Sequence, residues 1–209
     1  MKKHLIPVLK QRLTKHLPGW EAQKLMSPLP TEKYRLKSTT AKNAAVMLLL
    51  YPDEKEILHL IYIKRPASPF DKHSGQVSFP GGKVELTDGS FVNASLRETE
   101  EEIGINAMDI DILGQLSPLY IYASNFYVEP IVAYLNYKPQ LILQKSEVDY
   151  DIRIKLQYLL QDSSKGLIDY EIRNMVFKNM PYYKLNDEIL WGATAMITSE
   201  FLYIVKQLV

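Results

Sequence analysis

Four glutamates fall between residues 98 and 102, in the sequence R-E-T-E-E-E. On a helix, at about 100° per residue, Glu98, Glu101 and Glu102 share one sector, whereas Glu100 lies outside it and is expected to be solvated. Like charges at this spacing destabilise a helix by roughly a few tenths of a kcal/mol per pair. A solvated acidic face is the simplest interpretation, but a divalent cation held by the three carboxylates would offset their repulsion.

Carboxylates without a histidine or cysteine among them favour hard cations, Mg²⁺ or Mn²⁺, over zinc. Such a cation neutralises the charge of a diphosphate, polarises a phosphorus–oxygen bond and makes bound water more acidic. A carboxylate that is not fully committed to the cation can accept a proton from the attacking water. Glu98, Glu101 and Glu102 are therefore the predicted metal ligands, and Glu98 is also a candidate proton acceptor.

Two elements must position these glutamates: a glycine-rich turn and the helix that follows it. The turn is Pro80-Gly81-Gly82, where glycine provides backbone freedom and close approach. The helix is predicted over residues 89–103 and ends at Gly104. It carries an apolar stripe that would pack against a sheet, formed by Val92, Leu96 and Ile103.

This stretch resembles the signature of the Nudix hydrolases. The matching residues are Gly82, Arg97, Glu98, Glu101, Glu102, Gly104 and Ile105. Two departures, Asp88 at the acidic position and a spacer of eight residues before Arg97, are similar to the coenzyme A pyrophosphatase branch. That branch also has an upstream R…H-x-G-Q-V-S-F-P-G-G, found here from Arg65 and His73 onward. Weaker likeness continues at 124–126 and 191–195.

The resemblance implies cleavage of the diphosphate of coenzyme A, or of a derivative, to 4′-phosphopantetheine and 3′,5′-ADP with Mg²⁺ or Mn²⁺. It implies a catalytic set of Arg97, Glu98, Glu101 and Glu102, in which Arg97 orients a carboxylate. A surface salt bridge is the alternative for Arg97. Asp88 either approaches the cation or stabilises the loop before the helix. Some Nudix enzymes keep a late catalytic carboxylate in the kind of loop that holds Glu147, but a solvated strand-edge position is the favoured interpretation of that residue.

The residues expected to bind substrate flank the glycine turn or lie in the weaker match. They are Arg65, His73, Gln76, Gly81, Gly82, Asn125 and Phe126. Arg65 and His73 carry groups that can bind the 3′-phosphate of coenzyme A through charge-assisted hydrogen bonds. Lys64 and Lys72 are explained more simply as an ordinary basic loop, and residues 191–195 as packing for the last helix.

Two other functions remain open at this point. One is a Nudix pyrophosphatase for ADP-ribose, a dinucleotide or another nucleoside diphosphate compound. The other is a nucleotide-binding regulator that keeps the fold without turnover. The intact set of Arg97, Glu98, Glu101 and Glu102 argues against a regulator, because a pure binder need not keep every ligand.

Composition bounds the partners. The net charge of +1 gives no general attraction to nucleic acid or to an anionic membrane, so any phosphate binding must be local. The partner that the resemblance implies is a small diphosphate compound. There are no cysteines, and the longest apolar run, residues 44–50, is too short to span a bilayer. We expect a cytoplasmic protein. The oligomeric state is left open, with a homodimer among the alternatives.

Length and hydrophobic periodicity predict one α/β domain over residues 1–209, an α/β/α sandwich whose mixed sheet has helices on both faces. Residues 1–30 form an N-terminal helix and connector, the connector continuing irregularly to residue 41, and residues 73–105 form the glycine turn and the Nudix helix. Strands are predicted at 44–51, 57–63, 75–79, 110–113, 126–134, 148–156, 170–177 and 182–185. Further helices are predicted at 3–17, 157–161 and 192–207.

Overall fold

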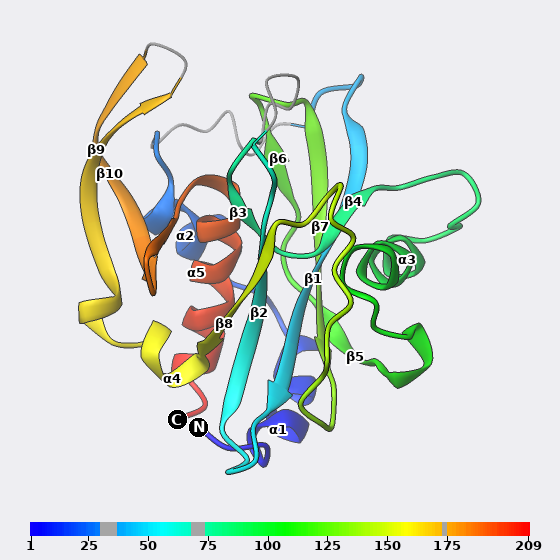
Figure 1. Ribbon diagram of the computed structural model, residues 1–209. Helices are drawn as coiled ribbons and strands as arrows, with labels where there is room; N and C mark the ends of the chain where they lie inside the picture. Colours follow the sequence, from blue (N-terminus) through cyan, green and yellow to red (C-terminus); the bar gives the residue numbers. More distant parts are fainter. Residues whose placement is uncertain (30–36, 68–73, 173–174) are drawn as a thin grey trace.

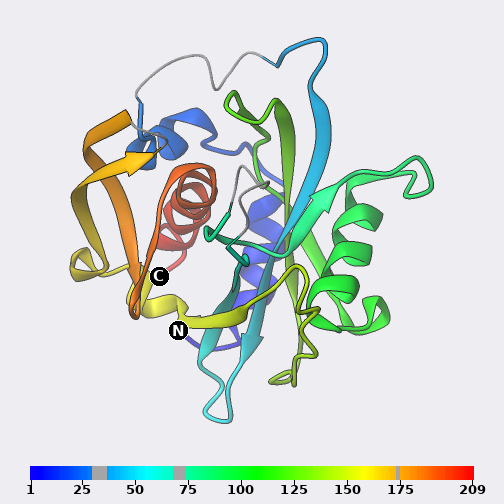
Figure 2. The same cartoon turned by 45° about the horizontal axis from the view of Figure 1, so that its top comes forward.

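The computed structural model describes residues 1–29, 37–67, 74–172 and 175–209. Among these residues a mixed sheet of eight strands lies between helix α3 on one face and helices α1 and α5 on the other (Figures 1 and 2). A second sheet of three antiparallel strands lies beside α5. This arrangement confirms the predicted α/β fold. In the described part of the chain, no helix is long and apolar enough to cross a membrane.

The main sheet is ordered β3-β2-β1-β7-β5, with β4 paired to β1, β6 to β7 and β8 to β2. Its strands are β1 (Lys42–Pro52), β2 (Leu58–Lys64), β3 (Val77–Ser78), β4 (Gly81–Lys83), β5 (Asp111–Gln115), β6 (Leu119–Ile121), β7 (Phe126–Tyr134) and β8 (Tyr150–Lys155). Strands β1 and β7 run parallel, and the other pairs are antiparallel.

The second sheet and the helices complete the fold. The sheet contains β9 (Lys165–Ile172), β10 (Met175–Leu185) and β11 (Glu188–Leu190). The α-helices are α1 (Leu5–Leu13), α2 (Trp20–Gln23), α3 (Phe91–Ile103), α4 (Leu156–Leu159) and α5 (Gly192–Lys206), and short 3₁₀ turns are η1 (Lys24–Met26), η3 (Ala107–Asp109) and η4 (Asp162–Ser164).

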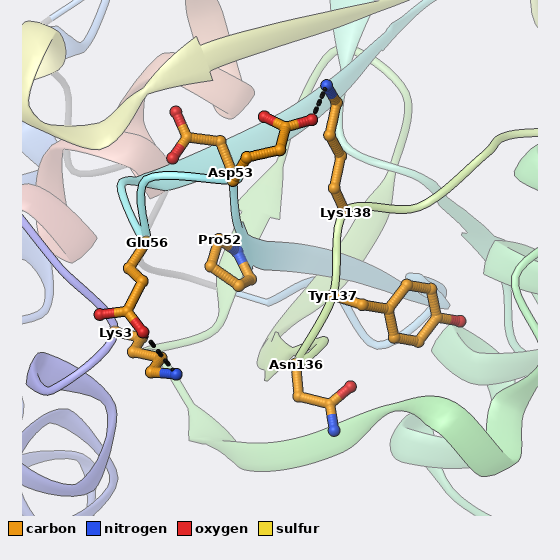
Figure 3. Close-up of a pocket in the computed structure, with 8 residues that line it drawn as sticks. Lys3, Pro52, Asp53, Glu56, Asn136, Tyr137 and Lys138 are labelled. Atoms are coloured by element: carbon orange, nitrogen blue, oxygen red, sulfur yellow. Dashed lines mark hydrogen bonds and ion pairs between the residues drawn. The ribbon is translucent and has the colours of Figure 1, made fainter.

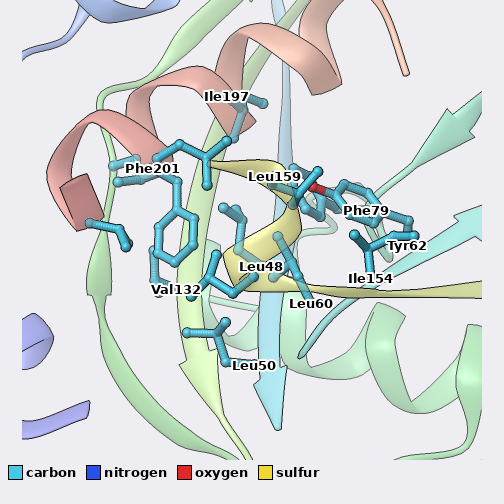
Figure 4. Packing of buried hydrophobic residues seen from close by; sticks show 14 of the residues in the cluster. Leu48, Leu50, Leu60, Tyr62, Phe79, Val132, Ile154, Leu159, Ile197 and Phe201 are labelled. Carbon is cyan, nitrogen blue, oxygen red and sulfur yellow. The ribbon is translucent and has the colours of Figure 1, made fainter. Parts of the chain in front are cut away.

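Alternation along the strands divides the core between the two faces of the main sheet. Leu48 of β1 and Val132 of β7 pack in the same cluster as Phe201 of α5 (Figure 4). The neighbouring Met47 points the other way, into a second cluster with Ile103 of α3. Because successive strand residues face opposite sides, both faces of β1 are buried, which explains its nearly continuous apolar sequence.

The glycine turn lies where β1 and β2 take different partners. Near their connecting turn the two strands pair directly, with Leu50 opposite Leu60. Toward their other ends β2 pairs with β3 and β1 pairs with β4, which places Gly82 opposite Ala45. The Met47 N–H donates to the carbonyl of Pro80 at 2.8 Å. The sheet therefore holds the turn on both sides.

Both ends of α3 are capped by its own sequence. The Ser90 side chain accepts a hydrogen bond from the Asn93 N–H at 3.1 Å, as an N-cap does. At the other end Gly104 adopts a left-handed conformation (φ 70°) and donates its N–H to the Glu100 carbonyl. These caps explain why the sequence-based bounds of 89–103 lie close to the observed Phe91–Ile103.

Two expectations were wrong in detail. The connector at 18–41 is not irregular throughout, because α2 and η1 occupy residues 20–26 and bury Ala22 and Met26. The strands predicted at 170–177 and 182–185 are divided differently, since β9 ends at Ile172 and β10 runs from Met175, the register partner of Ile172, to Leu185. No glycine or proline marks this division in the sequence.

Candidate active site

Three glutamates converge beside the glycine turn. Carboxylate oxygens of Glu98, Glu102 and Glu147 lie within 4.8 Å of one another. Glu98 and Glu102 come from α3, whereas Glu147 comes from the loop before β8. That loop is tied to α3 because the Gln144 N–H donates to the Glu102 carbonyl at 3.0 Å, and the Glu147 N–H donates to the Gln144 carbonyl at 2.9 Å.

The glycine turn contacts two of these carboxylates. The Gly81 N–H donates to Glu102 Oε2 at 2.8 Å. A Cβ atom at Gly82 would lie 2.6 Å from Cδ and both carboxylate oxygens of Glu98. A side chain at position 82 would therefore displace the Glu98 carboxylate, and the turn fixes the position of Glu102.

Burial strengthens the electrostatic conflict within the cluster. Glu102 is 1% exposed, and its burial raises the pKa to about 8 although the Gly81 N–H and Arg65 lower it. Burial also raises the pKa of Glu98, against the effect of Arg97. The Arg65 guanidinium lies 3.8 Å from Glu102 Oε1, a distance that offsets only part of the negative charge. A divalent cation is the natural complement of such a cluster.

Arg97 binds the carboxylates beside the cluster. Its guanidinium makes two hydrogen bonds to Asp88, at 2.8 and 3.1 Å, and lies 3.0 Å from oxygens of both Glu98 and Glu101. This contact holds the pKa of Asp88 below its usual value. Asp88 also accepts the Glu85 N–H at 2.7 Å. Asp88 therefore stabilises the loop before α3 and orients Arg97, which in turn holds Glu98.

Glu101 lies apart from the three converging carboxylates. Its side chain is 55% exposed and is paired with Arg97. Its metal-ligand role therefore stays a prediction from the sequence, while the geometry brings Glu147 into its place. Glu147 was the harder residue to identify, because only folding brings its loop to α3. The one signal in the sequence was the loop position implied by the resemblance.

The donor set fits a hard cation. Carboxylate oxygens from three side chains are ligands that Mg²⁺ and Mn²⁺ prefer. Glu98, Glu102 and Glu147 are the described residues that could hold such an ion. Gly81 and Arg97 bind two of these carboxylates and would fix their orientation toward it.

Comparison with known proteins decides the family. The NUDIX domain family matches residues 41–149, a segment that contains all three converging glutamates. This chain belongs to the Nudix hydrolase family. It is 33% identical to the uncharacterized Nudix hydrolase NudL of Photorhabdus laumondii, over 81% of this chain and 87% of that protein. It is also 33% identical to the same-named protein of Yersinia pestis, over 77% of this chain and 78% of that protein.

Solved Nudix structures share the fold at low sequence identity. The Nudix hydrolase RenU from M. smegmatis superimposes with a TM-score of 0.55 at 12% identity, covering 79% of this chain and 86% of RenU. A MutT/nudix family protein from Enterococcus faecalis superimposes with a TM-score of 0.53 at 17% identity, covering 99% of this chain and 75% of that protein. These structures support the fold class of this Nudix protein and carry no information about its substrate.

The predicted substrate-binding residues of this Nudix protein fall into separate places. The guanidinium of Arg65 lies at the cluster. Its backbone N–H donates to the carbonyl of Gln76 at 3.0 Å, so Gln76, the residue before β3, lies beside Arg65. The Asn125 side chain accepts from the Tyr120 hydroxyl and donates to the Thr40 carbonyl. With φ of 58°, Asn125 shapes a turn. Its amide is occupied by these contacts.

Two other residues predicted from the sequence, Phe126 and Trp191, show no contact with the glutamate cluster in the described part of the chain. Phe126 is partly buried and packs against the core on the α5 face of the sheet. His73 lies outside the described residues. Trp191 stands at the start of α5 with its ring centroid 5.5 Å from that of Tyr170, which agrees with a packing role.

A charged surface notch lies at the opposite end of β1, around the turn that joins it to β2 (Figure 3). Lys3 pairs with Glu56 and Lys138 pairs with Glu54, each at 2.7 Å. Three carboxylates, those of Asp53, Glu54 and Glu56, outnumber the two lysines there. The notch is separated from the glutamate cluster by the length of β1. It is not part of the Nudix site.

Proposed function

We propose that this Nudix protein is a divalent-cation-dependent hydrolase that cleaves the diphosphate of coenzyme A or a derivative to 4′-phosphopantetheine and 3′,5′-ADP. The observation that carries the hydrolase part is the convergence of Glu98, Glu102 and Glu147 within 4.8 Å beside the glycine turn. The coenzyme A part is supported by the sequence upstream of that turn, where Arg65, His73 and residues 75–82 resemble the coenzyme A pyrophosphatase branch.

In this proposal each residue of the site has a defined task. Glu98, Glu102 and Glu147 hold Mg²⁺ or Mn²⁺, which supplies charge neutralisation of the diphosphate and activation of water. The Gly81 N–H keeps Glu102 turned toward the site, and Arg97 does the same for Glu98. Arg65, whose guanidinium is at the cluster, binds a phosphate oxygen.

The proton of the attacking water needs an acceptor. Glu98 is held by Arg97 at 3.0 Å, which ties one of its carboxylate oxygens to the guanidinium. Glu147 is exposed at the mouth of the cluster and reaches it from a separate loop. We infer that Glu147 is the better placed of the two candidates to accept that proton.

The whole chain is proposed to act as one domain, beyond the matched residues 41–149. Support comes from the core on one face of the sheet, where Leu9 of α1 and Phe201 of α5 belong to the same cluster as Leu48 of β1. Removing either terminal helix would expose that cluster.

The substrate is tested by a product assay with Mg²⁺ across coenzyme A, ADP-ribose and NADH, with products separated by chromatography and identified by mass. The proposal expects 4′-phosphopantetheine and 3′,5′-ADP from coenzyme A at the highest kcat/KM. Faster cleavage of ADP-ribose or NADH would assign the protein to the alternative pyrophosphatase function. Binding without turnover of any compound would favour the regulator.

A further inference from the structure

Glu188 of β11 joins the small sheet to the main sheet. Its carboxylate lies 2.6 Å from Lys64 Nζ and also accepts a hydrogen bond from the Tyr150 hydroxyl. The Lys64 and Glu188 side chains are 20% and 24% exposed, so the pair is shielded from much of the solvent. The Glu188 side chain therefore binds both the end of β2 and the start of β8.

The two residues that Glu188 binds, Lys64 and Tyr150, are register partners. Lys64 and Tyr150 form the last pair of the β2–β8 ladder, and the Lys64 carbonyl accepts the Asp149 N–H at 2.9 Å. The β2–β8 ladder ends at this pair. Arg65 follows Lys64 directly, and Glu147 stands three residues before Tyr150.

Strand alternation places the contacts of Glu188 and the glutamate cluster on opposite faces of the main sheet. Leu60 and Tyr62 belong to the core on the α5 face, so Lys64, at the same parity, points there too. Ile63 belongs to the core on the α3 face, the face on which Arg65 approaches Glu102. Glu188 thus lies behind the site and contacts none of its carboxylates in the described residues.

The electrostatics indicate that the Glu188 carboxylate is ionised. Burial alone would raise the pKa of Glu188, but the hydrogen bonds from Lys64 and Tyr150 hold it below its usual value. The same carboxylate raises the pKa of Tyr150 to about 12, so the phenol keeps the proton that it donates. Both contacts persist at neutral pH.

We propose that Glu188 is a positioning residue that fixes the β2–β8 strand ends so that Arg65 and Glu147 meet the carboxylates of α3. This inference rests on the proposed cation site, because Glu147 is one of its three ligands. Loss of the Glu188 carboxylate would remove none of the three proposed ligands, but it would loosen the loop that positions Glu147. The expected defect is therefore weaker cation binding in a folded protein.

The test is a titration of Mn²⁺ into the metal-free full chain, followed by electron paramagnetic resonance, with kcat and KM measured alongside. Glu188→Gln is expected to weaken Mn²⁺ binding about three- to tenfold, somewhat less than loss of a residue touching a ligand. Tyr150→Phe should give a smaller change in the same direction. The exchange Lys64→Glu with Glu188→Lys should restore part of the affinity by restoring the ion pair.

The matched control is Glu54→Gln, which breaks the Lys138 ion pair at the far end of the same sheet (Figure 3) and should bind Mn²⁺ as the wild type does. Wild-type affinity in both Glu188→Gln and Tyr150→Phe would overturn the positioning role. A wild-type protein that binds no Mn²⁺ would instead overturn the proposed cation site, and the positioning role with it.

Discussion

Gly82 and Glu98 are in such close contact that a methyl group on Gly82 would lie 2.6 Å from the Glu98 carboxylate. Gly82 has no left-handed backbone conformation, so alanine is compatible with its main chain. Gly82→Ala is therefore expected to fold while displacing Glu98, and to lower kcat/KM by roughly a hundredfold or more, the scale of losing a main electrostatic element.

Gly89→Ala is the contrasting variant. Gly89 has φ of 68° with open space around its Cα, so a side chain there strains the backbone without touching the site. It should lower the unfolding temperature and leave kcat/KM near the wild-type value. Full activity in Gly82→Ala would show that Glu98 does not need its observed position.

Glu147 and Glu101 are distinguished by cation binding. The geometry places Glu147 with Glu98 and Glu102, while Glu101 pairs with Arg97. Glu147→Gln should weaken Mn²⁺ binding by about ten- to a hundredfold, and Glu101→Gln by clearly less. Isothermal titration calorimetry would measure both, with Glu100→Gln as the exposed control. A larger loss in Glu101→Gln than in Glu147→Gln would restore the ligand set expected from the sequence.

Arg65 is expected to act on the diphosphate. The sequence suggested that it reads the 3′-phosphate of coenzyme A, but its guanidinium lies 3.8 Å from Glu102, at the cluster itself. Arg65→Ala should therefore lower kcat/KM for coenzyme A and dephospho-coenzyme A alike, by roughly ten- to a hundredfold for one charge-assisted contact. Lys138→Ala, far from the cluster, serves as the charge-loss control. A loss confined to coenzyme A would return Arg65 to the 3′-phosphate.

The part of the site that the sequence predicted is local. Capping by Ser90 and Gly104 and the i, i+3, i+4 spacing of the glutamates are contained within one helix and its flanks. Glu147 could not be placed in this way, because its approach to Glu102 depends on the loop contact through Gln144. The same limit applies to Asn125, whose family-like sequence gave no sign that Tyr120 and Thr40 occupy its amide.

The fold shows the same division. The parallel alignment of β1 and β7 and the sharing of residues 77–83 between β1 and β2 join segments distant in the chain, so hydrophobic periodicity predicted the strands but not their partners. Residues 170–177 misled for a related reason. The stretch Y-E-I-R-N-M-V-F has no glycine or proline and resembles one strand, although β9 ends and β10 begins within it.

Glu200 of α5 should make stability depend on pH. It is fully buried, accepts hydrogen bonds from the Gly19 N–H and Gln23 Nε2, and has a pKa that burial raises above 4.5. Because the folded-state pKa is the higher one, the stability that Glu200 contributes is complete below pH 4.5 and is lost as pH rises through the folded-state pKa.

Thermal unfolding of wild type and Glu200→Gln between pH 4.5 and 8 would measure this. The unfolding temperature of the wild type relative to the variant should fall as pH rises, since the variant cannot ionise. Glu21→Gln, an exposed change on the neighbouring helix α2, is the control for loss of a carboxylate. A pH-independent difference for Glu200→Gln would contradict the assignment.

The most direct test of the central claim is the cation dependence of coenzyme A hydrolysis by the metal-free protein. Addition of Mg²⁺ or Mn²⁺ should start release of 3′,5′-ADP, and a chelator should stop it. Glu98→Gln and Glu102→Gln should each lower kcat by roughly a hundredfold or more with the cation present, whereas Glu100→Gln should not. Full turnover by the chelator-treated wild type, or equal losses in Glu100→Gln and Glu102→Gln, would contradict a cation site built from these carboxylates.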